Sequence, residues 1–131
     1  MTQPLILVCD DTANIAQLIS YHLQAEGYKV HLTSTALEAF SLARKEPPSL
    51  ILMDVMMPGM DGAMASELMH DAPGLGGVPV VLVSAMPEDE LRDRAQACGV
   101  QGYLTKPFTK QTLLDTVRKH ARVPIPHPQT G

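Results

Sequence analysis

Five short apolar segments alternate along this chain with longer stretches whose apolar residues recur at helical spacing. Three of the segments, LILVC, LILM and VPVVLV, are almost wholly apolar, which is typical of parallel strands covered by helices on both faces. The segment that begins at Tyr28 alternates apolar and polar residues, and it therefore fits an edge strand. The predicted strands are Leu5–Cys9, Tyr28–Thr33, Leu50–Met53, Val78–Val83 and Gly102–Thr105.

The stretches between and after these strands predict five amphipathic helices. Asp11 and Thr12 precede the first helix and are residue types that cap helices. Gly27 and Gly99 mark the ends of the first and fourth helices, and Pro47–Pro48 ends the second. The apolar positions that define the helices are Ile15, Leu18, Ile19 and Leu23, then Leu37 and Phe40, Met64 and Leu68, Leu91 and Ala95, and Leu113, Leu114 and Val117. Strands that alternate with helices imply right-handed crossovers and a three-layer α/β sandwich.

The length and composition suit one soluble domain. The chain has 131 residues, 45% of them hydrophobic, and a net charge of −4, without the basic runs that bind nucleic acid directly. No stretch approaches the roughly 18 apolar residues of a membrane-spanning helix, and no basic segment precedes the first apolar run as in a signal peptide. We therefore expect a cytoplasmic protein that contacts neither nucleic acid nor membrane directly.

The two cysteines and the C-terminal segment each have a simple interpretation. Cys9 and Cys98 lie in apolar contexts, which indicates buried thiols rather than a disulfide framework. After Arg122 the composition changes, with three prolines in five residues. We expect a domain over residues 1–122 and a Pro-rich tail over residues 123–131, which is either an unpacked terminus or the start of a linker.

Polar residues stand where the predicted strands end. Asp10 and Asp11 follow the first strand, Asp54 ends the third, Ser84 ends the fourth, and Lys106 lies just past the fifth. Because the carboxyl ends of the strands line the ligand crevice of an open parallel sheet, we expect these side chains to converge.

Carboxylates gathered in one crevice repel one another unless a cation compensates. Their oxygens suit Mg²⁺, which often binds alongside a phosphate. A lysine and a serine hydroxyl in the same crevice suit the charge of a transferring phosphoryl group, and a carboxylate can be the nucleophile that forms an aspartyl-phosphate.

Four motifs carry a resemblance to a known family. They are CDD (residues 9–11), LMDVMMPGMDG (52–62), SA (84–85) and YLTKPF (103–108). In their order and spacing they resemble bacterial response-regulator receiver domains, over about residues 4–121. The resemblance implies a flavodoxin-like sandwich with a five-stranded parallel sheet of order 2-1-3-4-5.

The resemblance also assigns roles to individual residues. It implies that Asp54 is phosphorylated, that Asp11 binds Mg²⁺ directly and Asp10 largely through water, and that the Met56 carbonyl is a backbone metal ligand. It implies that Ser84 and Lys106 hold the phosphoryl oxygens and assist phosphoryl transfer. By the same resemblance, Ser84 and Tyr103 form the switch, and the Lys106–Pro107 peptide bond is cis.

These roles imply a phosphoacceptor rather than an enzyme acting on other substrates. The phosphoryl group would come from a sensor histidine kinase or a histidine phosphotransfer protein. A downstream partner would bind the face formed by the fourth helix, the fifth strand and the fifth helix.

The resemblance also implies that Met56 and Met86 flank the path of the hydrolytic water. Since neither side chain can orient a water strongly, we expect slow self-dephosphorylation.

Three alternative functions use related chemistry. A haloacid-dehalogenase-type phosphatase would need an aspartate at position 12, where this chain has Thr12. A flavodoxin-like FMN binder would place a phosphate beside Asp10 and Asp11, which would repel it. A receiver-shaped interaction module that is never phosphorylated would not need the acidic set with Ser84 and Lys106. The residues therefore favour the phosphoacceptor.

Overall fold

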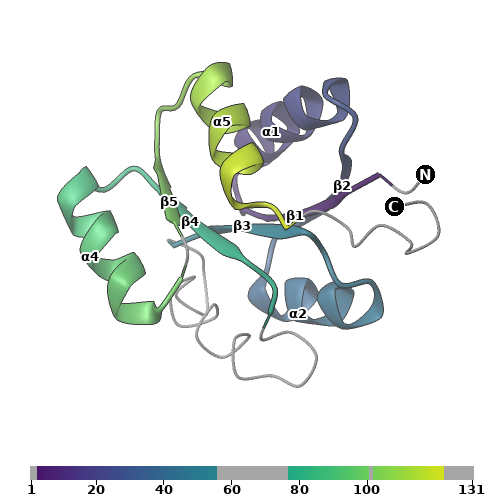
Figure 1. Ribbon diagram of the computed structural model, residues 1–131, viewed down its shortest axis with the longest axis horizontal. Helices are drawn as coiled ribbons and strands as arrows, with labels where there is room; N and C mark the ends of the chain where they lie inside the picture. Colours follow the sequence, from purple (N-terminus) through teal and green to yellow (C-terminus); the bar gives the residue numbers. More distant parts are fainter. Residues whose placement is uncertain (1–2, 56–76, 101, 123–131) are drawn as a thin grey trace.

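The computed structural model describes residues 3–55, 77–100 and 102–122. Strands and helices alternate along these residues (Figure 1). In chain order the elements are β1 (Leu5–Cys9), α1 (Ala13–Ala25), β2 (Lys29–Thr33), α2 (Ala36–Lys45), β3 (Leu50–Asp54), β4 (Val80–Ser84), α4 (Glu88–Cys98), β5 (Gly102–Thr105) and α5 (Lys110–His120).

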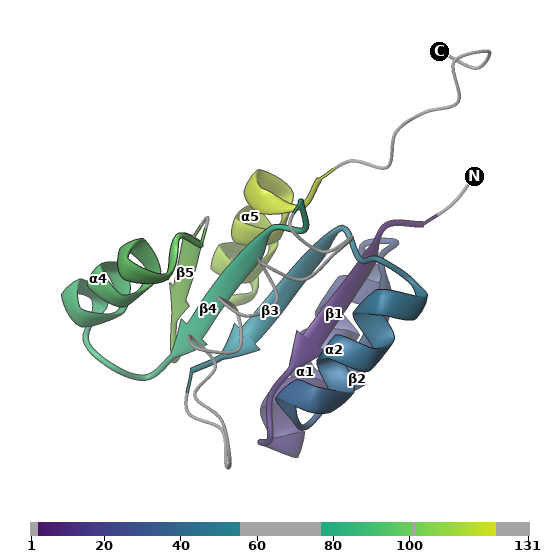
Figure 2. The same ribbon diagram turned by 90° about the horizontal axis from the view of Figure 1, so that it is seen from below.

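The strands form a single five-stranded sheet of order β2-β1-β3-β4-β5 in which every neighbouring pair is parallel (Figure 2). Cys9 of β1 is in register with Met53 of β3, and Ser84 of β4 with Thr105 of β5. Because all the strands run the same way, their carboxyl ends meet at one edge of the sheet. The predicted parallel sheet and its strand order are confirmed.

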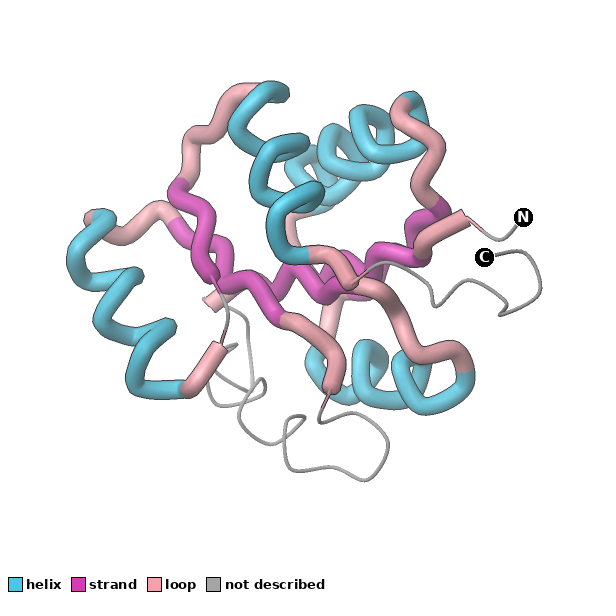
Figure 3. Tube along the Cα trace, in the orientation of Figure 1, coloured by secondary structure: helices cyan, strands magenta, loops and turns pink. Residues whose placement is uncertain are grey.

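Helices cover both faces of the sheet (Figure 3). On one face, Ile19 of α1 and Leu113 of α5 pack on strand residues such as Leu52. On the other, Ala39 of α2 and Leu91 of α4 pack in a second core. Both faces of the central strands are buried, which explains why β1, β3 and β4 read as continuous apolar runs.

Local sequence signals account for most helix ends. Gly27 and Gly99 have the positive φ angles of 93° and 71° that follow a helix C-terminus. The Thr35 hydroxyl caps α2 by accepting a hydrogen bond from the backbone N–H of Glu38. Thr12 is the N-cap residue of α1, but its side chain makes no capping hydrogen bond. Its backbone N–H donates to the Asp10 carboxylate at 2.8 Å, so Thr12 occupies the predicted capping position without a side-chain capping bond.

Other sequence predictions differ from the structure in detail or lie beyond it. Strand β4 begins at Val80 rather than Val78, because Pro79 has no N–H to donate to a neighbouring strand. The helix predicted around Met64 and Leu68 and the Pro-rich tail over residues 123–131 lie outside the described residues. Within the described part of the chain, none of the helices has the length and apolar character needed to cross a membrane.

Candidate functional site

Three aspartates come together at the carboxyl edge of the sheet. Asp10 follows β1 directly, Asp11 comes next, and Asp54 is the last residue of β3. Each offers a carboxylate oxygen, and these oxygens all lie within 4.8 Å of one another. Asp10 and Asp54 are buried, whereas Asp11 is exposed. The convergence predicted from the strand ends is therefore present in the structure.

Lys106 forms ion pairs with two of these aspartates. Its Nζ lies 2.9 Å from Oδ2 of Asp10 and 3.9 Å from Oδ2 of Asp54. The side chains are largely shielded, with 16% of Lys106, 2% of Asp10 and 6% of Asp54 exposed. An ion pair so shielded is screened much less by water and salt than a surface pair. The cluster nevertheless contains three carboxylates and this one lysine, so negative charge predominates among these four groups.

Ser84 and Lys106 are joined through the backbone as well. The backbone N–H of Lys106 donates to the Ser84 carbonyl at 2.8 Å, which places the two residues on adjacent strand ends. The Ser84 side chain is buried, and its Oγ accepts a hydrogen bond from the N–H of Met86 at 3.2 Å. The Lys106–Pro107 peptide bond is cis.

A cleft of about 720 Å³ opens over these groups. Its walls include Asp11, Asp54, Ser84 and Lys106, and also two charged residues of α4 that sequence reasoning did not single out, which are Glu90 and Arg94. The signal that could have found them is helical spacing, since Met86, Glu90 and Arg94 are each four residues apart and Met86 also lines the cleft.

Cys9 lies beside the aspartates without the properties of a reactive thiol. It is fully buried, and its Sγ donates to the backbone carbonyl of Thr35 at 3.4 Å. Burial raises the pKa of the Cys9 thiol to about 11, and the nearby charges of Asp10 and Asp54 add to this effect. The thiol is therefore protonated at neutral pH, in agreement with the predicted structural role.

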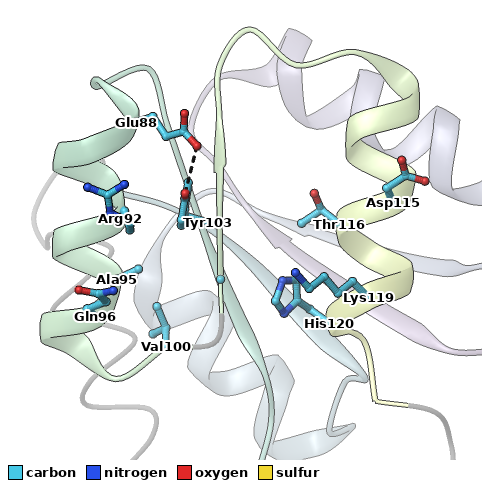
Figure 4. Close-up of a pocket in the computed structure, with 11 residues that line it drawn as sticks. Glu88, Arg92, Ala95, Gln96, Val100, Tyr103, Asp115, Thr116, Lys119 and His120 are labelled. Carbon is cyan, nitrogen blue, oxygen red and sulfur yellow. Dashed lines mark hydrogen bonds between the residues drawn. The ribbon is translucent and has the colours of Figure 1, made fainter.

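The other predicted functional residues lie elsewhere or outside the description. Tyr103 lies on β5 and lines a separate groove of about 540 Å³ between α4, β5 and α5, where its hydroxyl donates to Glu88 at 3.1 Å (Figure 4). That hydrogen bond raises the pKa of Tyr103. Met56, the expected backbone metal ligand, lies outside the described residues.

Comparison with known proteins shows which family the chain resembles. The model of the response regulator receiver domain matches residues 6–118. The response regulator PleD of Caulobacter vibrioides is 38% identical over 119 residues, covering 89% of this chain and 26% of PleD. The polar-differentiation response regulator DivK of Brucella ovis is 30% identical over 120 residues, covering 92% of this chain and 97% of DivK. The chain thus spans about a quarter of PleD and nearly all of DivK.

Solved structures agree with these relatives. The chemotaxis response regulator CheY4 of Vibrio cholerae superimposes with a TM-score of 0.84 at 30% identity, over 90% of this chain and 98% of CheY4. The receiver domain of the sensor histidine kinase PA1611 from Pseudomonas aeruginosa, which has a magnesium ion coordinated in its active-site cleft, gives a TM-score of 0.81 at 25% identity, over 90% and 97% of the two chains. By its fold and by its similarity along most of its length, the chain belongs to the response regulator receiver domain family.

Proposed function

We propose that Asp54 accepts a phosphoryl group from the phosphohistidine of a sensor histidine kinase or a histidine phosphotransfer protein. Receiver domains take phosphoryl groups from such donors. The observation that carries the assignment to Asp54 is its place at the end of the central strand β3, within 4.8 Å of the Asp10 and Asp11 carboxylates and 3.9 Å from the Lys106 amine. A buried carboxylate among these groups has both a cation partner and an opening to the cleft.

The same donor set fits Mg²⁺. Hard carboxylate oxygens within a few ångströms of one another are the ligands that this ion prefers, and it commonly retains waters and binds phosphate oxygens. Asp11 and Asp54 line the cleft and would hold the ion directly, and Asp10 would act largely through water. When bound, Mg²⁺ would neutralise the charge that otherwise repels an incoming phosphoryl group.

The transfer itself requires little covalent chemistry from the protein. A carboxylate oxygen of Asp54 forms a bond to phosphorus as the bond from phosphorus to the donor histidine nitrogen breaks, and the nitrogen keeps that electron pair. Lys106 would stabilise the charge on the phosphoryl oxygens, since its Nζ already lies 3.9 Å from Oδ2 of Asp54. The Ser84 hydroxyl, on the neighbouring strand end, would donate to another phosphoryl oxygen. The chain would thus assist its own phosphorylation without acting on other substrates.

Readout would follow from a movement of Ser84 and Tyr103. The Ser84 hydroxyl would turn toward the phosphoryl group, and Tyr103 would turn inward from the groove between α4, β5 and α5. This is a population shift between two arrangements of the same residues. The change would alter the walls of that groove, and we propose this face as the binding surface for the downstream partner.

Intact mass after incubation with acetyl phosphate and Mg²⁺ tests the assignment. Wild-type protein should gain one phosphoryl group, and Asp54→Asn should gain none. Asp93→Asn is the matched control, because Asp93 is an exposed carboxylate on α4 whose side chain is 74% exposed. Equal phosphoryl uptake by Asp54→Asn and wild type would show that another residue is the acceptor.

A further inference from the structure

A hydrogen bond connects the first residue of α4 to the second residue of β5. The Tyr103 hydroxyl donates to Oε2 of Glu88 at 3.1 Å across the groove between these elements (Figure 4). A charged acceptor makes such a bond stronger than one between neutral groups, although exposure to water reduces its strength. The contact holds the phenol at the surface of the groove.

The first turn of α4 carries three acidic residues, Glu88, Asp89 and Glu90, which a helix N-terminus stabilises. Their side chains nevertheless have different surroundings. Glu88 reaches Tyr103, whereas Glu90 lines the cleft over Asp54. Asp89 makes no hydrogen bond to Tyr103 among the described contacts. The hydrogen bond between Glu88 and Tyr103, called the latch below, therefore depends on one position rather than on the acidic turn as a whole.

Glu88 is also connected to the switch serine through a short segment of chain. The Ser84 Oγ accepts a hydrogen bond from the Met86 N–H, and Pro87 then leads directly into Glu88. If Ser84 Oγ is displaced toward a phosphoryl group, the geometry of this hydrogen bond changes with it. The segment that carries the Tyr103 acceptor is thereby coupled to the position of Ser84 Oγ.

We propose that Glu88 is a positioning residue that holds Tyr103 outward and so opposes the switch, an inference that rests on the function proposed above. Breaking one exposed, charge-assisted hydrogen bond should raise the ratio of inward to outward Tyr103 by about threefold to tenfold. The ratio changes before any phosphorylation, because the hydrogen bond belongs to the unphosphorylated state. Glu88 thereby sets the fraction of unphosphorylated receiver in which Tyr103 already points inward.

The test compares Glu88→Ala with wild type, using Asp89→Ala as a control of equal charge in the same helical turn. Tyr21→Phe and Tyr28→Phe are introduced throughout so that Tyr103 is the sole tyrosine. NMR contacts between the Tyr103 ring and the Ser84 β-protons report the inward position without any phosphodonor. These contacts should strengthen in Glu88→Ala and stay unchanged in Asp89→Ala. An unchanged ring position in Glu88→Ala would overturn the proposal.

A titration of the phenol provides a second readout. Because hydrogen bonding to Glu88 raises the Tyr103 pKa, with burial and the Glu88 charge adding to it and Arg92 opposing it, Glu88→Ala should lower that pKa. A pKa equal to that of wild type would show that the bond does not form in solution, and the latch would be refuted. Neither readout uses Asp54, so a failure of Asp54 to accept phosphate would refute the proposed function and leave both results on Glu88 valid.

Discussion

At the scale of single residues, adjacent aspartates have different surroundings. Asp10 is buried, bonded to the Lys106 amine through Oδ2 and to the Thr12 N–H through Oδ1. Asp11 is exposed and lines the cleft beside Asp54. Burying an ionised carboxylate is costly unless it is paired and hydrogen-bonded, and Asp10 meets that requirement within the protein. Asp11 is instead placed to meet a ligand from solution.

This difference predicts the effect of Asp11→Ala on metal binding. Mg²⁺ bound only to the folded state stabilises it by mass action, by about 1.4 kcal/mol at ten times its dissociation constant, which is a few degrees in melting temperature. Thermal melting with and without millimolar Mg²⁺ should show this rise for wild type and lose it for Asp11→Ala. Asp115→Ala, which removes an exposed carboxylate on α5, should keep the rise. A full Mg²⁺ response in Asp11→Ala would remove that residue from the metal site.

The Met86 side chain should affect the rate at which the phosphorylated protein loses its phosphoryl group. It is partly buried against the core on the α2 side and also lines the cleft that contains Asp54. Its thioether cannot orient a water by a strong hydrogen bond. A positioned polar group contributes about tenfold to a thousandfold to such reactions, so Met86→Glu should speed dephosphorylation by about tenfold. Decay of the phosphorylated protein measures this, and equal rates in Met86→Glu and Met86→Leu would exclude the side chain from the mechanism.

At the scale of elements, the conformation of a single glycine marks the C-terminal end of α4. The helix ends at Cys98, and Gly99 then adopts a φ of 71°, in the left-handed region that favours glycine. A Cβ at Gly99 would meet no atom within 4 Å, so the cost of a side chain there comes from the backbone alone. The chain turns at this residue and enters β5, which carries Tyr103.

We predict that Gly99→Ala lowers the free energy of unfolding by about 1–2 kcal/mol, because an L-residue with a Cβ is strained in this conformation. Gly99→Asn should cost less, since asparagine tolerates the left-handed region better. Urea denaturation of the two variants measures both values. If alanine and asparagine have the same effect, the cost does not come from backbone conformation.

The elements also show how far sequence reasoning reaches. Asp54 and Ser84 were placed correctly because each ends a continuous apolar run, and parallel strands bring such ends to one edge. The contact of Glu88 with Tyr103 was not predicted. It depends on the rotation of α4 against β5, which is set by the packing of buried residues such as Leu91 and leaves no motif in the chain. Strand ends are thus encoded locally, whereas helix rotation is a property of the assembled core.

At the scale of the whole molecule, the acidic cleft and the groove containing Tyr103 are separate sites on the same sheet. Ser84 ends β4 in the cleft, and Tyr103 lies on the neighbouring strand β5, where Leu82 is its partner in register. The segment from Ser84 to Glu88 passes from one site to the other. Only this short segment therefore separates the cleft that contains Asp54 from the surface formed by α4, β5 and α5.

This arrangement predicts where the protein changes when Asp54 carries a phosphoryl mimic. Beryllofluoride with Mg²⁺ should shift backbone NMR resonances in the acidic cleft and also in α4, β5 and α5, whereas α2, which packs against β1 and β2, should change little. A ligand shifts a two-state equilibrium only by its differential affinity for the two states, so the distant shifts should saturate together with those in the cleft. Replacing Tyr103 by alanine should reduce the shifts in the groove and leave those around Asp54. Shifts confined to the cleft in wild type would show that phosphorylation is not transmitted to this face.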